Sequence, residues 1–305
     1  MPRTVIVTGA SGFLGRHVAR NWTEAGYQVL GIGRDAWDEA DWRAWGLSKW
    51  ICGDVTLDTL AAFRVTPDVI THCAGSGSVG FSFQDPAEDF QSTAGTLLST
   101  LEFIRLRAPE ARLVYPSSAA VYGEVDHLPI REEAAPRPAS PYGTHKLVAE
   151  LLCQSYSRHF NLKVVIVRLF SLYGPWLRKQ LLWDACCKFS RGEATFLGTG
   201  EESRDWLHVV DSANLLQTAA EHAGRDCTVV NGGSGVGTSV REVLTMLRQS
   251  FPDAPPLHFT AQAKAGDPKE YLGDCSKAEV WGWKPAVSLR AGLVEYSTWF
   301  QGERP

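Results

Sequence analysis

The feature that most constrains this chain is a glycine-rich stretch, Thr8–Gly15, that separates an apolar run at 4–7 from a helix-compatible segment at 15–25. Its three glycines recur every third residue. In a strand-to-helix turn, such glycines let backbone N–H groups approach a phosphate at the positive end of a helix. An ordinary tight turn is the alternative when the stretch is taken alone. The expected dinucleotide contacts are Gly9, Ser11, Gly12, Phe13, Leu14 and Gly15.

A second pattern lies far downstream, where Tyr142 and Lys146 are spaced to share one face of a helix. A nearby ammonium favours the phenolate form of a tyrosine and so equips it for proton transfer. The pair Ser117-Ser118 follows an apolar run, and a hydroxyl there can reach the same reacting oxygen. Each pattern alone has a structural explanation. Together, behind a dinucleotide turn, they predict an acid–base site.

Strand and helix signals alternate along the first half of the chain. Apolar runs occur near 4–7, 28–32, 69–73, 112–115 and 164–168, and helical stretches near 15–25, 87–107 and 144–159. This alternation predicts an α/β fold, a Rossmann-type doubly wound parallel sheet. Turn-rich sequence and helical stretches near 239–250 and 289–300 then predict a smaller C-terminal substrate-binding lobe. The expected division is a dinucleotide-binding domain of residues 1–170 and 204–231, and a lobe of residues 171–203 and 232–305.

Composition excludes several partner classes. The 305 residues carry a net charge of −4, which does not favour nucleic acid or an anionic membrane as partner. No apolar run is long enough to span a bilayer, and the N-terminal run is too short for a signal peptide, which predicts a cytoplasmic protein. The seven cysteines lack metal-type pair spacing, so reduced thiols and no metal site are expected.

Taken together, the motifs resemble those of extended short-chain dehydrogenases/reductases, in the NAD(P)-dependent nucleotide-sugar epimerase/dehydratase family. The resemblance spans nearly the whole chain and is carried by Thr8–Gly15, 53–55, 72–75, 116–123, 140–146, 168–175, 204–211 and 276–278. It implies a nucleotide-sugar substrate and a catalytic trio of Ser118, Tyr142 and Lys146. Counted back from the Val-Tyr-Gly motif, the active hydroxyl is that of Ser118 rather than Ser117.

The same resemblance bears on the cofactor. NAD-binding members place a carboxylate at the end of the second strand, and that position is Gly33 here. Arg34 follows, and its guanidinium suits a 2′-phosphate, which favours NADP(H). The alternative is NAD(H), with Asp35 reaching the ribose. Further implied cofactor contacts are Asp54, Val55, Ala74, Gly75, Tyr142 and Lys146, and implied substrate contacts are Ser118, Arg204 and Lys264.

Departures from the family patterns narrow the reaction. Ala119-Ala120 stands where sugar 4,6-dehydratases carry an acid–base pair, and Ala120 and Trp176 replace the Cys and His of enzymes that resemble GDP-fucose synthase. Ketone reduction and 4-epimerisation remain, and Arg34 favours the reduction. The expected reaction is NADPH-dependent reduction of the keto group, expected at C4, of a nucleotide-linked 4-keto-6-deoxy sugar, with the proton from Tyr142. The alternatives are an NAD-dependent nucleotide-sugar 4-epimerase and a non-catalytic nucleotide-binding protein.

A homodimer is also expected, because related dimers pair the helices that correspond to 92–107 and 144–159. Their apolar stripes are Leu97, Leu98, Leu101 and Ile104 on the first and Leu147, Leu151 and Leu152 on the second. Inward packing on the sheet is the alternative. A cluster of Trp37, Trp42, Trp45 and Trp50 fits either a packed flap or a partner site.

Overall fold

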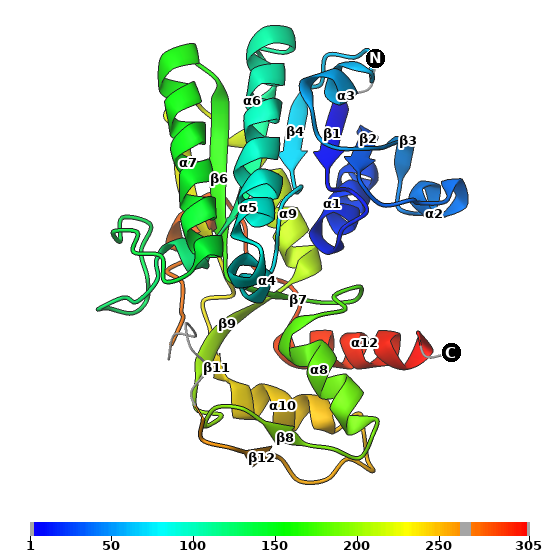
Figure 1. Ribbon diagram of the computed structural model, residues 1–305, viewed down its shortest axis with the longest axis vertical. Coiled ribbons are helices and arrows are strands. Elements are labelled where there is room, and N and C mark those ends of the chain that lie inside the picture. Colours follow the sequence, from blue (N-terminus) through cyan, green and yellow to red (C-terminus); the bar gives the residue numbers. More distant parts are fainter. Residues whose placement is uncertain (1–2, 263–269, 304–305) are drawn as a thin grey trace.

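The computed structural model describes residues 3–262 and 270–303. Seven strands form its central sheet: β1 Thr4–Thr8, β2 Gln28–Gly33, β3 Leu47–Cys52, β4 Val69–His72, β5 Arg112–Ser118, β6 Lys163–Leu169 and β10 Thr228–Gly232. Their order is β10-β6-β5-β4-β1-β2-β3, and every neighbouring pair is parallel. Figure 1 shows a smaller lobe beyond the carboxyl ends of these strands. The predicted doubly wound sheet with a smaller C-terminal lobe is confirmed.

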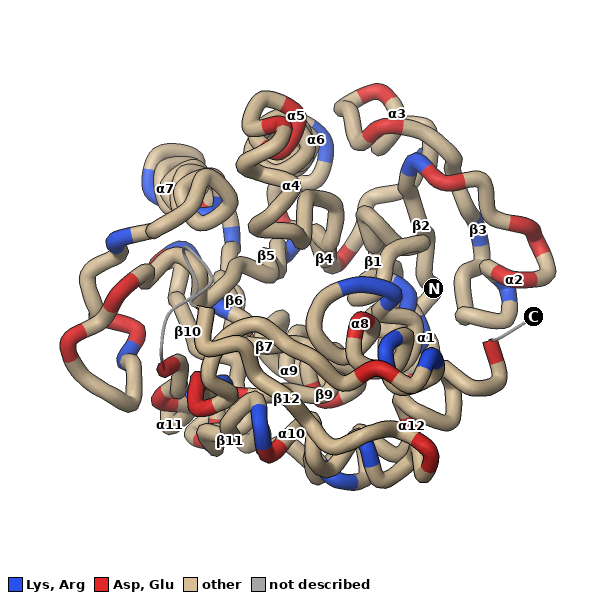
Figure 2. Tube along the Cα trace, turned by 60° about the horizontal axis from the view of Figure 1, so that its bottom comes forward, with Lys and Arg blue, Asp and Glu red and all other residues tan. Residues whose placement is uncertain are grey.

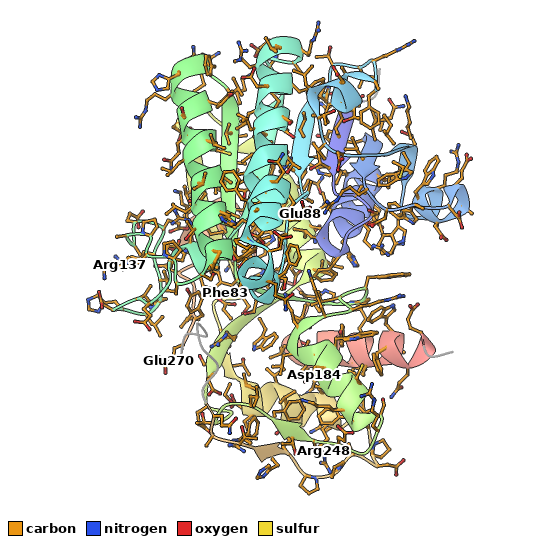
Figure 3. The ribbon with its side chains drawn as sticks, in the orientation of Figure 1. Phe83, Glu88, Arg137, Asp184, Arg248 and Glu270 are labelled. Atoms are coloured by element: carbon orange, nitrogen blue, oxygen red, sulfur yellow. The ribbon has the colours of Figure 1, made fainter. Side chains whose placement is uncertain are left out.

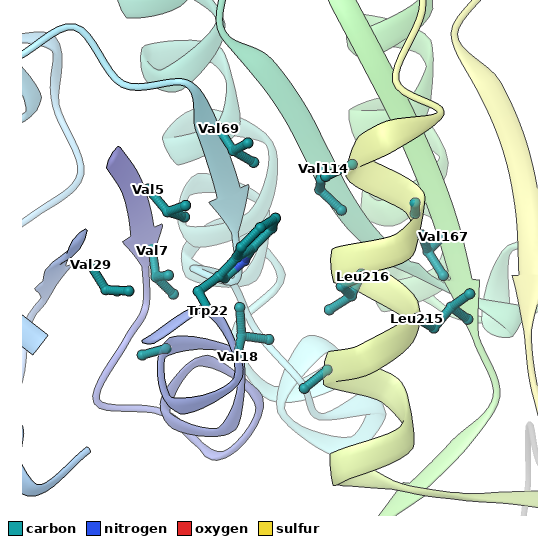
Figure 4. Packing of buried hydrophobic residues seen from close by; sticks show 14 of the residues in the cluster. Val5, Val7, Val18, Trp22, Val29, Val69, Val114, Val167, Leu215 and Leu216 are labelled. Atoms are coloured by element: carbon teal, nitrogen blue, oxygen red, sulfur yellow. The ribbon is translucent and has the colours of Figure 1, made fainter. Parts of the chain in front are cut away.

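Helices cover both faces of this sheet because successive strand residues point to opposite sides. Val5 and Val7 face α1 (Phe13–Glu24) and α9 (Val209–Glu221), as Figure 4 shows for one part of the core. Ile6 belongs to the core on the other face, which is covered by α3 Leu57–Ala61, α6 Thr96–Arg107 and α7 Pro141–Phe160.

The helical stretch predicted near 87–107 is not one regular helix. It consists of α5 (Pro86–Phe90), a π-helical turn (Gln91–Gly95) and α6, and the short α4 (Val79–Gln84) precedes it. Asp85 starts α5, since its side chain accepts a hydrogen bond from the N–H of Glu88 at 3.0 Å. Single π-helical turns inside helices recur at functional sites.

Two strands of the sheet were missing from the predicted set. β3 is an edge strand whose residues alternate irregularly between exposed and half-buried positions, so it lacks a continuous apolar run. β10 lies at the opposite edge and ends in Asn231 and Gly232. Short helices flank these edges: α2 Glu39–Ala44 and α11 Ser276–Val280.

The smaller lobe has its own sheets and core. Its strands are β7 Ser171–Tyr173, β9 Ser203–His208 and β11 Gly237–Ser239, which form one sheet, and the paired β8 Thr195–Phe196 and β12 His258–Phe259. Its helices are α8 Gln180–Phe189, α10 Val240–Arg248 and α12 Leu289–Gly302. Residues 204–231 were predicted to belong to the domain that holds the main sheet. Within this segment, α9 and most of β10 join that domain, whereas β9 pairs within the lobe. The functional division into cofactor and substrate parts stays a prediction.

Aromatic and basic side chains fill the junction between the sheet domain and the lobe. The guanidinium of Arg16 in α1 lies 5.4 Å from the Trp37 ring, 5.3 Å from Trp45 and 4.4 Å from Trp176. Trp176 in turn lies 6.0 Å from Trp299 of α12. Figure 2 shows basic positions gathered beside α1. We call these five residues the tryptophan junction. Of the two explanations left open for the tryptophans after β2, packing is therefore the one observed.

Candidate active site

The glycine turn connects β1 to α1, as predicted. Gly9 has φ +64°, and a Cβ there would lie 2.7 Å from the backbone nitrogen of Ala74, which follows β4. A Cβ on Gly15 would collide with the carbonyl oxygen of Gly9. Gly12 is the N-cap of α1, so the N–H groups of Phe13 and Leu14 have no partner within the helix. Backbone N–H groups in a cradle without side chains fit a dinucleotide pyrophosphate.

At the end of β2, three consecutive residues have different surroundings. A Cβ on Gly33 would lie 2.8 Å from the Trp50 ring, so a larger side chain there would have to displace that ring. Arg34 is 64% exposed and pairs with Glu88 of α5 at 2.8 Å. The Asp35 carboxylate accepts a 2.8 Å hydrogen bond from the hydroxyl of Ser11 in the glycine turn. Asp35, rather than Arg34, is thus the charged side chain held at that turn.

The remaining predicted cofactor residues follow β3 and β4. Asp54 is exposed and Val55 is buried in the core under α3. The N–H of Ala74 donates to the Thr8 hydroxyl at 3.1 Å, which ties the end of β4 to the end of β1. Because these strands are parallel, their carboxyl ends bring the predicted cofactor residues to one edge of the sheet.

The predicted catalytic trio meets at the same edge. Ser118 ends β5, Tyr142 lies in the first turn of α7, and Lys146 lies one turn further on. The Lys146 ammonium donates to the carbonyl oxygen of Pro116 at 3.1 Å and lies 6.0 Å from the centroid of the Tyr142 ring. The backbone N–H of Tyr142 donates to the Ser82 hydroxyl of α4 at 3.0 Å, which fixes the start of the helix.

Burial changes the proton affinity of both ionisable members. It raises the pKa of Tyr142 above its ordinary value, and a hydrogen bond with Ser118 only partly offsets this effect. Burial lowers the pKa of Lys146 to about 8. The spacing of Tyr142 and Lys146 in the sequence predicts that Lys146 lowers the pKa of Tyr142. In the structure, desolvation of the phenol outweighs any such effect.

Ser117 has a different role from its neighbour. Its hydroxyl donates to Glu150 of α7 at 2.6 Å, in the interior. Glu150 also binds Arg168 of β6 through both of its oxygens, and the Arg168 guanidinium lies 4.7 Å from the Tyr122 ring. Ser117 is therefore part of a buried network, which supports Ser118 as the hydroxyl beside Tyr142.

A cavity of about 1660 Å³ opens next to this site, within the lobe and the loop after β5. Its wall includes Ser171 at the start of β7, only two residues past Leu169, which pairs with Ser118 in the sheet. Asp184 and Glu270 line it from opposite sides (Figure 3). Its aromatic lining consists of Tyr173, Phe196 and Trp206. No sequence pattern singled these three residues out, because they become neighbours only when the lobe folds.

Of the two predicted substrate contacts other than Ser118, Arg204 lines this cavity from β9, and its guanidinium donates to the carbonyl oxygen of Ser203 at 2.7 Å. The neighbouring Asp205 is buried and accepts hydrogen bonds from the N–H groups of Ser234, Gly235 and Gly273. It therefore holds loops of the lobe together. The other predicted contact, Lys264, lies outside the described residues.

Within 3–262 and 270–303, no three His, Cys, Asp or Glu side chains are grouped so that they could hold a metal ion. None of the helices in these ranges combines the length and the apolar character needed to cross a membrane. Cytoplasmic location stays a prediction.

The chain resembles known proteins over almost its full length. A model of the NAD dependent epimerase/dehydratase family matches residues 5–233. The UDP-glucose 4-epimerase of Azospirillum brasilense is 30% identical, over 95% of this chain and 89% of that protein. The structure of Thermotoga maritima UDP-glucose 4-epimerase with UDP-glucose superposes with a TM-score of 0.87 at 26% identity, covering 98% of this chain and 99% of the other. The Bacillus cereus UDP-glucuronic acid 4-epimerase, solved with UDP-glucuronic acid and NAD, gives a TM-score of 0.87 at 25% identity, with the same coverage of 98% and 99%.

Proposed function

This chain belongs to the NAD-dependent epimerase/dehydratase family, and we propose that it interconverts UDP-linked sugars that differ in configuration at C4, with NAD as cofactor. The observation that carries the proposal is the meeting of Ser118, Tyr142 and Lys146 at the edge of the sheet that holds the glycine turn. Ala119 and Ala120, which follow the active hydroxyl, offer no further group for proton transfer. These three side chains suit a reaction through one ketone intermediate and lack the acid–base groups needed to eliminate water.

The chemistry divides between the cofactor and the chain. NAD, when bound, supplies reversible acceptance and return of a hydride at the sugar carbon. Tyr142 takes the proton of the C4 hydroxyl and later returns it, while Ser118 donates a hydrogen bond to the same oxygen. Lys146 favours the phenolate of Tyr142 by its charge and would hydrogen-bond the ribose of the bound cofactor. Hydride and proton both return to the sugar, so the overall reaction is redox-neutral.

The cofactor assignment rests on the end of β2. The Asp35 carboxylate, held by Ser11, is suited to accept hydrogen bonds from a ribose diol. Arg34 is engaged with Glu88 instead. The family model is that of NAD-dependent enzymes and the Bacillus cereus structure was solved with NAD, so neither supports the NADP(H) preference that Arg34 suggested in the sequence.

The cavity is the proposed place for the nucleotide part of the substrate. Its volume of about 1660 Å³ exceeds that of pockets for typical drug-sized ligands, which are roughly 300–1,000 Å³. Arg204 supplies a guanidinium suited to a diphosphate, and the aromatic lining supplies faces for a base. Uracil is inferred from the relatives' UDP-sugars.

The second candidate is the NADPH-dependent 4-ketoreductase, which the sequence Gly33-Arg34 favours. Incubating the purified protein with UDP-galactose or UDP-glucuronic acid, and separating the products by chromatography, distinguishes the two. We expect the C4 epimer to form with catalytic NAD and no net change in nicotinamide absorbance. Stoichiometric NADPH consumption with a nucleotide-linked 4-keto-6-deoxy sugar, and no epimer, would reject the 4-epimerase.

Tyr142→Phe is the control variant for this assay. It removes one hydroxyl, so it is expected to fold and to bind the cofactor normally. Its turnover should fall by about 10²–10⁴-fold, the usual contribution of a general acid–base group. Ser118→Ala should lose less, and Ser117→Ala should leave turnover least affected because its hydroxyl binds Glu150 in the interior. Near-normal turnover by Tyr142→Phe would contradict the mechanism.

A further inference from the structure

One buried pair beside the active site has no part in the mechanism above. His145 lies on α7, between Tyr142 and Lys146 in the sequence, and its Nδ1 is 2.5 Å from an oxygen of Asp89 on α5. The Asp89 side chain is 0% exposed and that of His145 is 13% exposed. The Phe90 ring meets the His145 ring edge-on at 5.3 Å. The pair thus links α5, just before the π-helical turn, to the first turn of the helix that carries Tyr142.

The second oxygen of Asp89 distinguishes this pair from an ordinary structural contact. Within the described residues, Oδ1 is buried and has no hydrogen-bond partner. A buried carboxylate that only held two helices together would be expected to have both oxygens satisfied, because a bare oxygen costs free energy. By contrast, Glu150, which is also buried and lies on α7 with His145, binds partners through both of its oxygens. Asp89 therefore retains an uncompensated negative character next to the site.

The charges around the phenol show where this negative character acts. Tyr142 is faced by Ser118 and Tyr115 from β5, by Lys146 from its own helix and by Asp89 from α5. Asp89 is the carboxylate among them, and its charge raises the pKa of both Tyr142 and Lys146, although burial is the largest influence on each. Two other carboxylates lie further along α7 and are each neutralised by an arginine. Glu150 of α7 pairs with Arg168 of β6, and Glu102 pairs with Arg105 on α6.

We propose that Asp89 and His145 are a positioning pair for the reaction proposed above: their hydrogen bond fixes the first turn of α7, which carries Tyr142, and holds the Asp89 carboxylate beside the active site. A group that both takes and returns a proton works best when neither form is strongly favoured near the working pH. In this chain, the hydrogen bond with Ser118 pulls Tyr142 towards the phenolate, and the Asp89 charge pulls it in the opposite direction.

Asp89→Asn tests the charge while it keeps the shape. The amide can still hydrogen-bond His145, so α5 stays attached to α7, but the negative charge is gone. On the acidic side of its pH profile, kcat/KM rises with pH. We expect the midpoint of this rise to move down by about one pH unit, the size of shift that one nearby charge produces. The KM for the sugar nucleotide should not change, because Asp89 is buried away from it. Glu88→Gln, next to it on α5 (Figure 3), is the matched control: Glu88 pairs with Arg34, and its replacement should not move this pH.

His145→Asn tests the other partner. Its amide can donate to Asp89 in place of the ring nitrogen, and the Asp89 charge is retained. The acidic-side transition is therefore expected at the parent's pH, unlike that of Asp89→Asn. A purely structural pair would instead lower stability or kcat in both variants and leave the transition in place. That result, or a downward shift in His145→Asn, would overturn the proposal.

A second measurement separates this proposal from the proposed function. The near-ultraviolet absorbance of phenolate, taken as the difference between each protein and its Tyr142→Phe counterpart, reports the ionisation of Tyr142 without any turnover. If the parent has no 4-epimerase activity, this titration still tests the pair. If epimerase activity is present but Tyr142 ionises at the same pH in Asp89→Asn as in the parent, the proposal about the Asp89–His145 pair is wrong and the proposed function stands.

Discussion

Lys146 carries an ammonium in an interior where it is only 7% exposed. Its carbonyl partner, Pro116, neutralises none of its charge, so burial is the main influence on its proton affinity. The residue therefore changes charge much closer to neutrality than an exposed lysine. This matters because the proposed mechanism gives Lys146 two roles, both of which need the ammonium.

The affinity for NAD is therefore expected to depend on pH. The pKa of Lys146 is lowered to about 8, so the ammonium is present below that pH and lost above it. NAD binding, measured by calorimetry across this range, should weaken as the pH rises through about 8. Lys146→Met, which has no ionisable group, should bind weakly at every pH and show no such transition. An unchanged affinity of the parent up to pH 10, about the ordinary lysine value, would contradict the assignment.

Cofactor choice is tested at Arg34 and Asp35. Asp35→Asn should weaken NAD binding by roughly tenfold or more, since a hydrogen bond to a charged group contributes about 1.5–3 kcal/mol. Arg34→Ala should leave NAD affinity nearly unchanged, because this exposed side chain is directed at Glu88. Titration of both variants with NAD and NADP checks this expectation. Selective loss of NADP binding in Arg34→Ala, from a parent that prefers NADP, would restore the sequence-based preference.

Residues that recur in motifs could be predicted from the sequence, and residues that meet only through folding could not. Tyr142 and Lys146 are one helical turn apart, so their spacing alone places them together. Asp89 and His145 are brought together only by the packing of α5 on α7. Likewise, the Ser11–Asp35 contact depends on how β2 ends beside the glycine turn.

Among the elements, α7 and β6 are joined by a buried ion pair. The side chains of Arg168 and Glu150 are 5% and 1% exposed, and Ser117 of β5 also donates to Glu150. Both charges have hydrogen-bonding partners, so the pair is compatible with the interior. Removing one partner leaves the other charge buried and uncompensated.

Glu150→Gln is therefore expected to destabilise the fold by about 3–5 kcal/mol. The control is Glu102→Gln, whose ion pair with Arg105 is partly exposed, and which should cost about 0–1 kcal/mol. Urea unfolding followed by circular dichroism measures both. Equal, small effects would show that the buried pair contributes no more than a surface one.

Most residues of the helical stripes predicted from the sequence pack inward on the sheet, which was the alternative to a dimer interface. Leu97, Leu101 and Ile104 are fully buried against the sheet, and Leu152 packs on the same core. A period of 3.6 residues identifies an apolar face, but the burial that satisfies it can come from the sheet as readily as from a partner. Leu98 and Leu151 of these stripes do point outward, as do Phe90, Leu106 and Phe160.

For the whole molecule, we propose that this outward face of α6 and α7 pairs with a second copy of the chain. Leu98 is 41% exposed and Leu151 is 53% exposed, which is costly for large apolar side chains in water. Light scattering at micromolar concentration should give the mass of a dimer. The double variant Leu98→Asp/Leu151→Asp should be monomeric, whereas Val280→Asp, at an exposed position on α11, should remain dimeric. A monomeric parent would reject the dimer.

The tryptophan junction gives this molecule a built-in optical probe. Trp37 and Trp45 belong to the sheet domain, Trp176 to the chain that leads into the lobe and Trp299 to α12, and Arg16 lies among the first three rings. Any displacement of the lobe relative to the sheet changes the polarity and the ring contacts that these indoles experience. Their emission also overlaps the absorption of a reduced nicotinamide ring. Unlabelled protein can therefore report lobe movement and the redox state of its cofactor in the same fluorescence experiment.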